Sequence, residues 1–99
     1  MTPEAKVKKK VRDALNEFGA YYVMPVTGGY GRQGAPDFLV CYKGSFIGVE
    51  CKAGKGVTTP LQEKNLHNIQ EAGGHALVIN ENNLADLEGL LLKLTKEQL

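Results

Sequence analysis

The sequence has few of the residues that build disulfide frameworks or zinc sites. Two cysteines, two histidines and no tryptophan occur among its 99 residues. Cys41 and Cys51 have no Cys-x-x-Cys partner, so a zinc site is not expected. Each lies in an apolar run on one of two neighbouring predicted strands, where disulfides rarely form well. We interpret both as reduced, partly buried thiols.

Long apolar runs and a strong net charge are also missing. No run approaches the ~20 residues of a membrane-spanning helix, and lysines rather than an apolar signal region follow the first residues. We therefore expect a cytoplasmic protein with no membrane partner. The 42% share of hydrophobic residues is sufficient for a core, and the length fits a single domain over residues 1–99.

The net charge of +1 does not by itself indicate a nucleic-acid partner, but the charge is unevenly distributed. The first predicted helix is strongly basic, whereas residues 81–88 lean acidic. Such asymmetry permits a local surface for polyanions on a chain that is not basic as a whole. The basic residues form either a solvated helix face or contacts with phosphates. They are Lys6, Lys8, Lys9, Lys10 and Arg12.

A β-hairpin is predicted in the middle of the chain. The β-rich runs 38–42 and 46–52 flank a short turn at 43–45, which contains a glycine. We expect a two-residue turn, either Lys43-Gly44 or Gly44-Ser45. With either turn, the residue numbers of each cross-strand pair add up to an odd number. An odd-numbered residue on one strand therefore lies opposite an even-numbered residue on the other.

Three charged side chains gather at the open end of this hairpin. Either turn places Asp37 opposite Glu50 or Lys52, and the strand period of two puts all three on one face. Opposed residues have Cβ atoms ~5 Å apart, and diagonal ones ~7–8 Å apart. Two carboxylates at that range repel unless a cation lies between them, and their hard oxygens suit Mg²⁺ or Mn²⁺. The alternative is that Asp37 is a turn residue after Pro36 and that Glu50 and Lys52 form the solvated edge of a strand. The combination of the three charged residues favours a functional site.

A helix is predicted over residues 3–18, with Thr2 as its N-cap and Gly19 as its end. Its apolar stripe extends back to Glu4, which is either a helix-dipole acid or a carboxylate aimed toward whatever the helix packs on. A strand follows at 21–26, and Pro25 indicates an edge position.

Two loops carry candidate nucleic-acid contacts. In the glycine-rich loop 27–34, Tyr30 can stack on a base or sugar and Arg32 can pair with a phosphate; an ordinary mobile loop is the equal alternative. Lys55 lies in the loop after the hairpin. The loop Gly54-Lys55-Gly56 lacks the spacing of a phosphate loop.

The second half of the chain reads as helix, strand and helix. Thr59 and Gln62 form a capping box for a helix over 60–72, and Gln62 either caps that helix or points back at the sheet. The apolar run 75–80 predicts a central strand, and a leucine-rich helix begins near residue 82 or 83. The order is α-β-β-β-α-β-α, an α/β fold with a mixed sheet flanked by helices on both faces.

The residues Pro36-Asp37 and Glu50-Cys51-Lys52 on a hairpin resemble the signature of the PD-(D/E)xK nuclease superfamily. With Glu4, Gly34 and Gln62, the chain looks most like the virus-type replication-repair nuclease (VRR-Nuc) family in its stand-alone form. The resemblance covers nearly the whole chain. It implies a restriction-endonuclease-like αβββαβ core with an extra C-terminal helix. Two positions depart from the family pattern: Cys51 replaces a more usual apolar residue, and Leu66 replaces a frequent aromatic one.

The resemblance implies a Mg²⁺- or Mn²⁺-dependent DNA endonuclease. Asp37, Glu50 and the backbone carbonyl of Cys51 would hold the ion. Lys52 would position or deprotonate the attacking water, and Gln62 would orient Lys52 or that water. Glu4 would complete the metal site or hold a second ion.

Stand-alone members resemble Holliday-junction resolvases, so the resemblance also implies a homodimer that cuts branched DNA. It further implies a microbial host, with a virus or phage as a second source. The alternatives are a non-catalytic nucleic-acid-binding module of the same fold, an interaction protein that uses its leucine-rich last helix, and an enzyme acting on RNA or linear ends. The candidate nucleic-acid contacts are Lys6, Lys9, Lys10, Tyr30, Arg32 and Lys55.

Overall fold

The computed structural model describes residues 1–26 and 33–98, and within them the helices and strands follow the predicted order. The boundaries lie close to those expected from caps and periodicity. The exception is the first strand, which ends before Pro25 rather than at residue 26. The elements are α1 (Pro3–Phe18), β1 (Tyr21–Val23), β2 (Phe38–Tyr42), β3 (Ser45–Cys51), α2 (Pro60–Glu71), β4 (His75–Ile79) and α3 (Leu84–Glu97).

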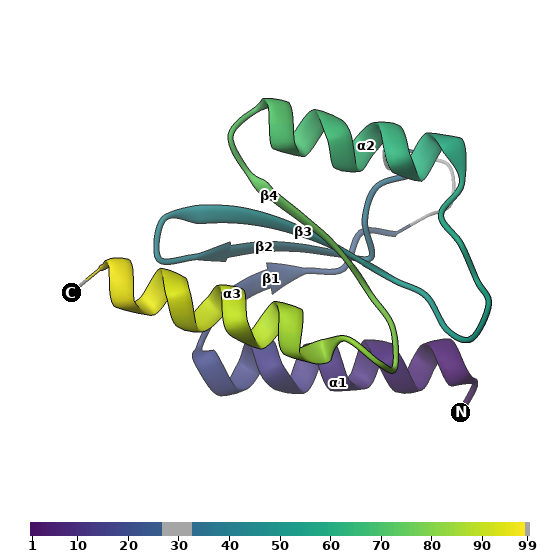
Figure 1. The fold of residues 1–99 in the computed structure, drawn as a ribbon, viewed down its shortest axis with the longest axis horizontal. Helices are drawn as coiled ribbons and strands as arrows, with labels where there is room; N and C mark the ends of the chain where they lie inside the picture. Colours follow the sequence, from purple (N-terminus) through teal and green to yellow (C-terminus); the bar gives the residue numbers. More distant parts are fainter. Residues whose placement is uncertain (27–32, 99) are drawn as a thin grey trace.

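The sheet lies between two helical layers (Figure 1). Helix α2 covers one face, and α1 and α3 lie side by side on the other. The strand order is β1-β2-β3-β4, with β1, β2 and β3 antiparallel and β4 parallel to β3. The parallel pair needs a crossover, which α2 supplies. The mixed α/β sheet predicted from the sequence is therefore confirmed.

The prediction that β4 is a central strand is wrong. Within the described residues β4 pairs with β3 alone and lies at the edge of the sheet. Its apolar character has another cause, because β4 packs against both α2 and α3. A strand covered on both faces reads as a continuous apolar run wherever it lies in the sheet.

The turn between β2 and β3 fixes the register of the site. Lys43 and Gly44 have φ of 50° and 80°, the positive values of a two-residue turn whose twist matches the strands. Tyr42 consequently pairs with Ser45, and the last ladder pair is Phe38 with Val49. One step further along the hairpin, Asp37 faces Glu50.

The apolar core lies between the sheet and the α1–α3 layer. Alternate residues of β2 and β3 point into it, and the intervening residues face α2. Thr2 caps α1 by accepting from the Ala5 N–H at 3.1 Å, and Gly19 ends it at φ 75°. The fully buried side chains include Val11, Leu15, Phe38, Val40, Ile47, Val49, Cys51, Ile79, Leu87 and Leu91.

The cysteines differ from each other in burial. Cys51 is buried, and burial raises the pKa of its thiol to about 12, so the side chain stays neutral in the core. Cys41 is exposed, so the prediction of a partly buried thiol is wrong there: its strand position faces the α2 side, which α2 does not cover at β1 and β2. Both thiols are free. None of the described helices is long and apolar enough to cross a membrane.

Candidate active site

Four elements meet at one end of the molecule. Figure 1 shows the N-terminal ends of α1 and α2 on the same side as the C-terminal end of β3. The chain enters β2 at this end too. The charged residues singled out in the sequence come from these four places, so their proximity follows from the fold.

Asp37 is fixed by the backbone of the opposite strand. Its Oδ2 accepts a 2.8 Å hydrogen bond from the Cys51 N–H. The Asp37 carboxylate thus accepts from the backbone N–H of Cys51, which lies beyond the last paired residues of β2 and β3. This bond prolongs the hairpin by one step and holds the acid beside Glu50.

Glu50 is a buried carboxylate that is only partly satisfied. The residue is 3% exposed. Its Oε2 accepts from Gln62 Nε2 at 3.2 Å and lies 3.5 Å from Lys52 Nζ. Its Oε1 is buried and has no hydrogen-bond partner among residues 1–26 and 33–98. A buried carboxylate oxygen without a partner is costly and is rare in native structures.

The environment of Glu50 opposes its ionisation. Burial raises the pKa of Glu50, the nearby Asp37 carboxylate raises it further, and Lys52 lowers it; the result is about 7, against an ordinary value of 4.5. Two acids therefore act on each other at the open end of the hairpin. The structure brings Asp37 and Glu50 together as the register requires.

Gln62 both caps α2 and contacts the site, the two roles that the sequence left open. Its Oε1 accepts from the Thr59 N–H at 2.9 Å, which completes the capping box of α2. Its Nε2 donates to Glu50. One side chain therefore connects the start of α2 to the buried acid on β3.

Lys8 belongs to the cluster, although the sequence marks it only as one of several basic residues on the first helix. Its Nζ lies 3.5 Å from Glu4 Oε2 and 3.6 Å from Asp37 Oδ1. Partial burial works to lower the pKa of Lys8, but the charges of Asp37 and Glu4 outweigh this effect and the pKa is raised. The available signal was its spacing, one turn after Glu4 and next to the buried Val7.

The donor set fits a divalent cation held by two acids. Within residues 1–26 and 33–98, no group of three or more His, Cys, Asp or Glu side chains is placed to hold a metal ion. Asp37 and Glu50 remain, and Oε1 of Glu50 offers a lone pair that none of the described protein groups uses. Mg²⁺ commonly binds one or two carboxylates and takes its other ligands from water and phosphate. The residues present therefore fit Mg²⁺ or Mn²⁺.

Comparison with known proteins identifies the fold. No protein-family model and no curated protein matches the sequence. A solved structure described as "VRR_NUC domain" matches with a TM-score of 0.70 over 100% of both chains, with 23% identical residues. The chain has the fold of a VRR_NUC domain. The restriction-endonuclease-like architecture drawn from the sequence is thereby confirmed, and at this identity the likeness concerns the fold.

The candidate nucleic-acid residues of this VRR_NUC fold are spread over two elements. Lys6, Lys9 and Lys10 lie on the exposed side of α1, and Lys55 is exposed in the loop after β3. The Nζ of Lys9 is 2.8 Å from Oδ2 of Asp13. Two further candidates, Tyr30 and Arg32, lie outside the described residues.

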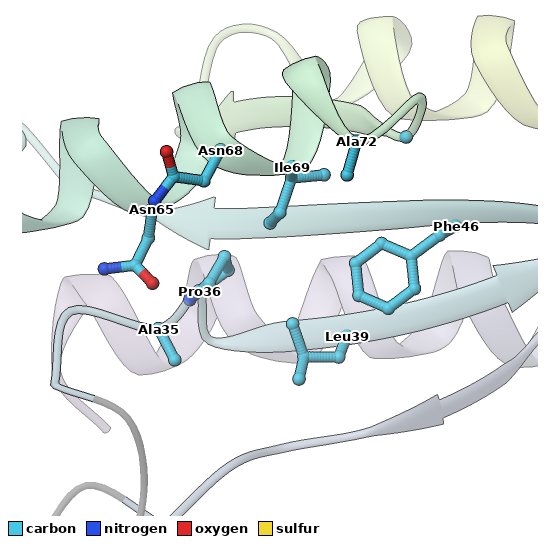
Figure 2. Close-up of a pocket in the computed structure, with 9 residues that line it drawn as sticks. Ala35, Pro36, Leu39, Phe46, Asn65, Asn68, Ile69 and Ala72 are labelled. Carbon is cyan, nitrogen blue, oxygen red and sulfur yellow. The ribbon is translucent and has the colours of Figure 1, made fainter.

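A groove of about 420 Å³ lies beside the acid cluster, between α2 and the strands β2 and β3 (Figure 2). None of the residues that line it has a titratable side chain, so the groove lacks the acids and amines of the cluster beside it. At its Pro36 end it reaches the segment that enters the site. The lining residues are Ala35, Pro36, Leu39, Phe46, Asn65, Asn68, Ile69, Ala72 and Gly74.

Asn65 attaches this segment to α2. Its buried Nδ2 donates to the carbonyl of Gln33 at 3.1 Å and to that of Leu61 at 2.9 Å. Gly34 has φ 77°, and a Cβ there would lie 2.7 Å from the Leu61 Cγ. The chain thus approaches α2 closely just before Asp37, which explains the glycine at this position.

Proposed function

We propose that this chain is a member of the VRR-Nuc family and a Mg²⁺- or Mn²⁺-dependent endonuclease that hydrolyses phosphodiester bonds in DNA. One observation carries the proposal. Oε1 of Glu50 is buried next to a second carboxylate, Asp37, and the described part of the chain offers it no hydrogen-bond partner. Such an arrangement is unfavourable in the free protein and becomes favourable when a cation binds, which is typical of a functional site.

Asp37, Glu50 and the backbone carbonyl of Cys51 would hold the ion. The side chain of Cys51 takes no part, because its neutral thiol points into the core. When bound, a divalent ion polarises the phosphodiester and lowers the pKa of a coordinated water. Gln62 and the Cys51 N–H keep the two acids in position, since each donates a hydrogen bond to one of them.

Lys52 is the residue that we assign to the reacting water and phosphate. Its Nζ lies 3.5 Å from Glu50 Oε2, and its side chain is 16% exposed, so the ammonium is at the site and within reach of solvent. From there the ammonium can position the attacking water and stabilise negative charge on the phosphate, whereas deprotonation of that water would require the neutral amine. Gln62 restricts Lys52 indirectly by holding their common partner, Glu50.

The substrate that we propose is branched DNA, in particular a four-way junction. Lys6, Lys9, Lys10, Lys55 and Arg32 would supply positive charge for its backbone, and Tyr30 would stack on a base or sugar. One small site cuts one strand, and a junction needs two coordinated cuts. We therefore propose a homodimer with two sites.

The test uses supercoiled plasmid, linear duplex and a four-way junction, each with Mg²⁺, Mn²⁺ or EDTA. We expect cleavage that requires the metal, favours the junction, and is lost in Asp37→Ala and Lys52→Ala. Glu97→Gln on α3 is the matched control, because it neutralises an exposed acid whose partner is Lys93. Cleavage in EDTA, or full cleavage by both site variants, would contradict the proposal.

A second outcome would identify a different function. Metal-independent binding of the junction, with no cleavage in any metal, would make the chain a nucleic-acid-binding module. Asp37 already has an ammonium partner in Lys8 at 3.6 Å, so part of the negative charge is neutralised by the protein alone. A binding module would depend on the lysines of α1 and not on Asp37.

A further inference from the structure

Lys8 differs from the other lysines of α1 in the number and origin of its partners. Its Nζ lies between Glu4, one turn earlier on the same helix, and Asp37 at the start of β2. The side chains of Lys8 and Asp37 are 32% and 18% exposed. An ordinary pair on the same helix, Lys9 with Asp13, has two exposed members and no third partner among the described residues.

The contacts divide the acids of the site into two groups. Glu50 lies beside Lys52, at 3.5 Å, and has the free Oε1. Glu4 and Asp37 share Lys8. Because Lys8 has acids on both sides, its ammonium bridges them as a cation.

The charge of the cluster limits how many divalent ions it can hold. Three acids and two ammonium groups leave one net negative charge. A single divalent ion and the one negative charge of a phosphodiester together make the occupied site neutral. A second divalent ion would leave a surplus of two positive charges in a partly buried place, which is unfavourable.

We infer that Lys8 is a built-in second cation of this site: it bridges Glu4 and Asp37, so that the chain binds one divalent ion and Glu4 acts through Lys8 rather than as a metal ligand. This inference rests on the proposed metal site at Asp37 and Glu50. It assigns Lys8 as a positioning residue. It also explains why Glu4 lies near the site but, within the described residues, does not form a metal-binding group of three acids with Asp37 and Glu50.

Counting bound Mn²⁺ tests the inference without any substrate. Isothermal titration and electron paramagnetic resonance give the number of ions per chain and their affinity. We expect one ion in the unmodified protein and in Lys8→Arg, which keeps the positive charge. In Lys8→Met we expect a second, weaker ion, because Glu4 and Asp37 are released, and the double variant Glu4→Gln/Lys8→Met should lose it again.

Glu4→Gln alone separates a ligand from a residue that acts through Lys8. We expect it to weaken Mn²⁺ binding by no more than about 100-fold, the upper end of the effect of residues outside the ligand shell. Lys93→Met on α3 is the matched control, because it also removes the lysine of an i,i+4 ion pair, and it should bind one ion with unchanged affinity. Circular dichroism in EDTA establishes that each variant is folded.

The outcomes separate this inference from the proposed function. Two ions in the unmodified protein, a single ion in Lys8→Met, or a loss above about 100-fold in Glu4→Gln would overturn the role of Lys8 and leave the metal site intact. No bound ion in the unmodified protein would overturn the proposed metal site, and the inference with it.

Discussion

Asp37 accepts a 2.8 Å hydrogen bond from the backbone N–H of Cys51, the residue that follows Glu50. The acid that opens one strand is therefore held by the backbone next to the acid that closes the other. Repulsion between the two carboxylates cannot separate them without breaking this bond. The hairpin thus enforces a proximity that is unfavourable until a cation binds.

Asp37→Asn and Asp37→Ala should differ in stability but not in activity. The asparagine keeps an oxygen that can accept from Cys51, whereas alanine leaves that N–H without a partner, at a cost of about 1–3 kcal/mol. Both remove the charge that holds the cation, so both should lose about 100-fold or more in cleavage rate. Urea unfolding in EDTA and single-turnover cleavage give the two quantities. Equal stability of the two variants would show that the hydrogen bond contributes little.

The stability of the metal-free protein should fall as the pH rises from about 4.5 to about 7. Below this range Glu50 is protonated in both the folded and the unfolded chain. Within it the unfolded chain has already released the proton, whereas the folded chain retains it because burial and Asp37 raise the pKa of Glu50 to about 7. The loss is complete above pH 7 and should be on the order of a few kcal/mol.

Glu50→Gln isolates this effect, because glutamine does not titrate. Urea unfolding in EDTA at a series of pH values should show a shallower fall for Glu50→Gln than for the unmodified protein. Mn²⁺ should stabilise the unmodified protein more at pH 8 than at pH 5, since a metal ligand must be deprotonated. Identical pH profiles for the two proteins would contradict the environment described for Glu50.

Gln62 and Thr59 allow the cap of α2 to be separated from the contact with Glu50. Thr59→Ala removes the cap alone, and it should cost about 1 kcal/mol in unfolding free energy with little change in cleavage. Gln62→Glu keeps an acceptor for the cap but replaces the donor to Glu50 with a negative charge. It should reduce the cleavage rate about tenfold or more at nearly unchanged stability. Equal cleavage by the two variants would reduce Gln62 to a capping residue.

Asn65 should be needed for both stability and activity, although it does not touch the acids. Asn65→Ala removes two hydrogen bonds from a buried amide and frees the chain that leads to Asp37. We expect a loss of about 1–3 kcal/mol in unfolding free energy and a lower cleavage rate at saturating metal. Asn68→Ala, in the same groove, is the control and should change stability by less than about 0.5 kcal/mol. Full activity of Asn65→Ala would show that Asp37 is positioned without α2.

Local signals were sufficient to predict most of the elements. The N-caps at Thr2 and Thr59 and the end of α1 at Gly19 lie where the sequence indicates them. The strand period and the short turn required Asp37 to face Glu50 or Lys52, and the turn at Lys43-Gly44 selected Glu50. These features depend on neighbouring residues, which the sequence specifies directly.

Other features depend on how the elements dock. The apolar run of β4 indicated a central strand, but helices on both faces cover an edge strand equally well. In the sequence Lys8 is one of several lysines on a basic helix. Only the packing of α1 against the start of β2 brings it to Asp37. The capping and site roles of Gln62 were alternatives in the sequence, and the position of α2 over β3 allows both.

The sequence by itself determined which residues carry charge at the end of the hairpin, because strand alternation and turn length are local properties of the chain. Only the tertiary structure decided which partner each charge has. Lys8 and Gln62 come from helices that are distant in sequence, and no periodicity encodes the docking that brings them to Asp37 and Glu50. That docking is set by burial of the two helix faces against the sheet.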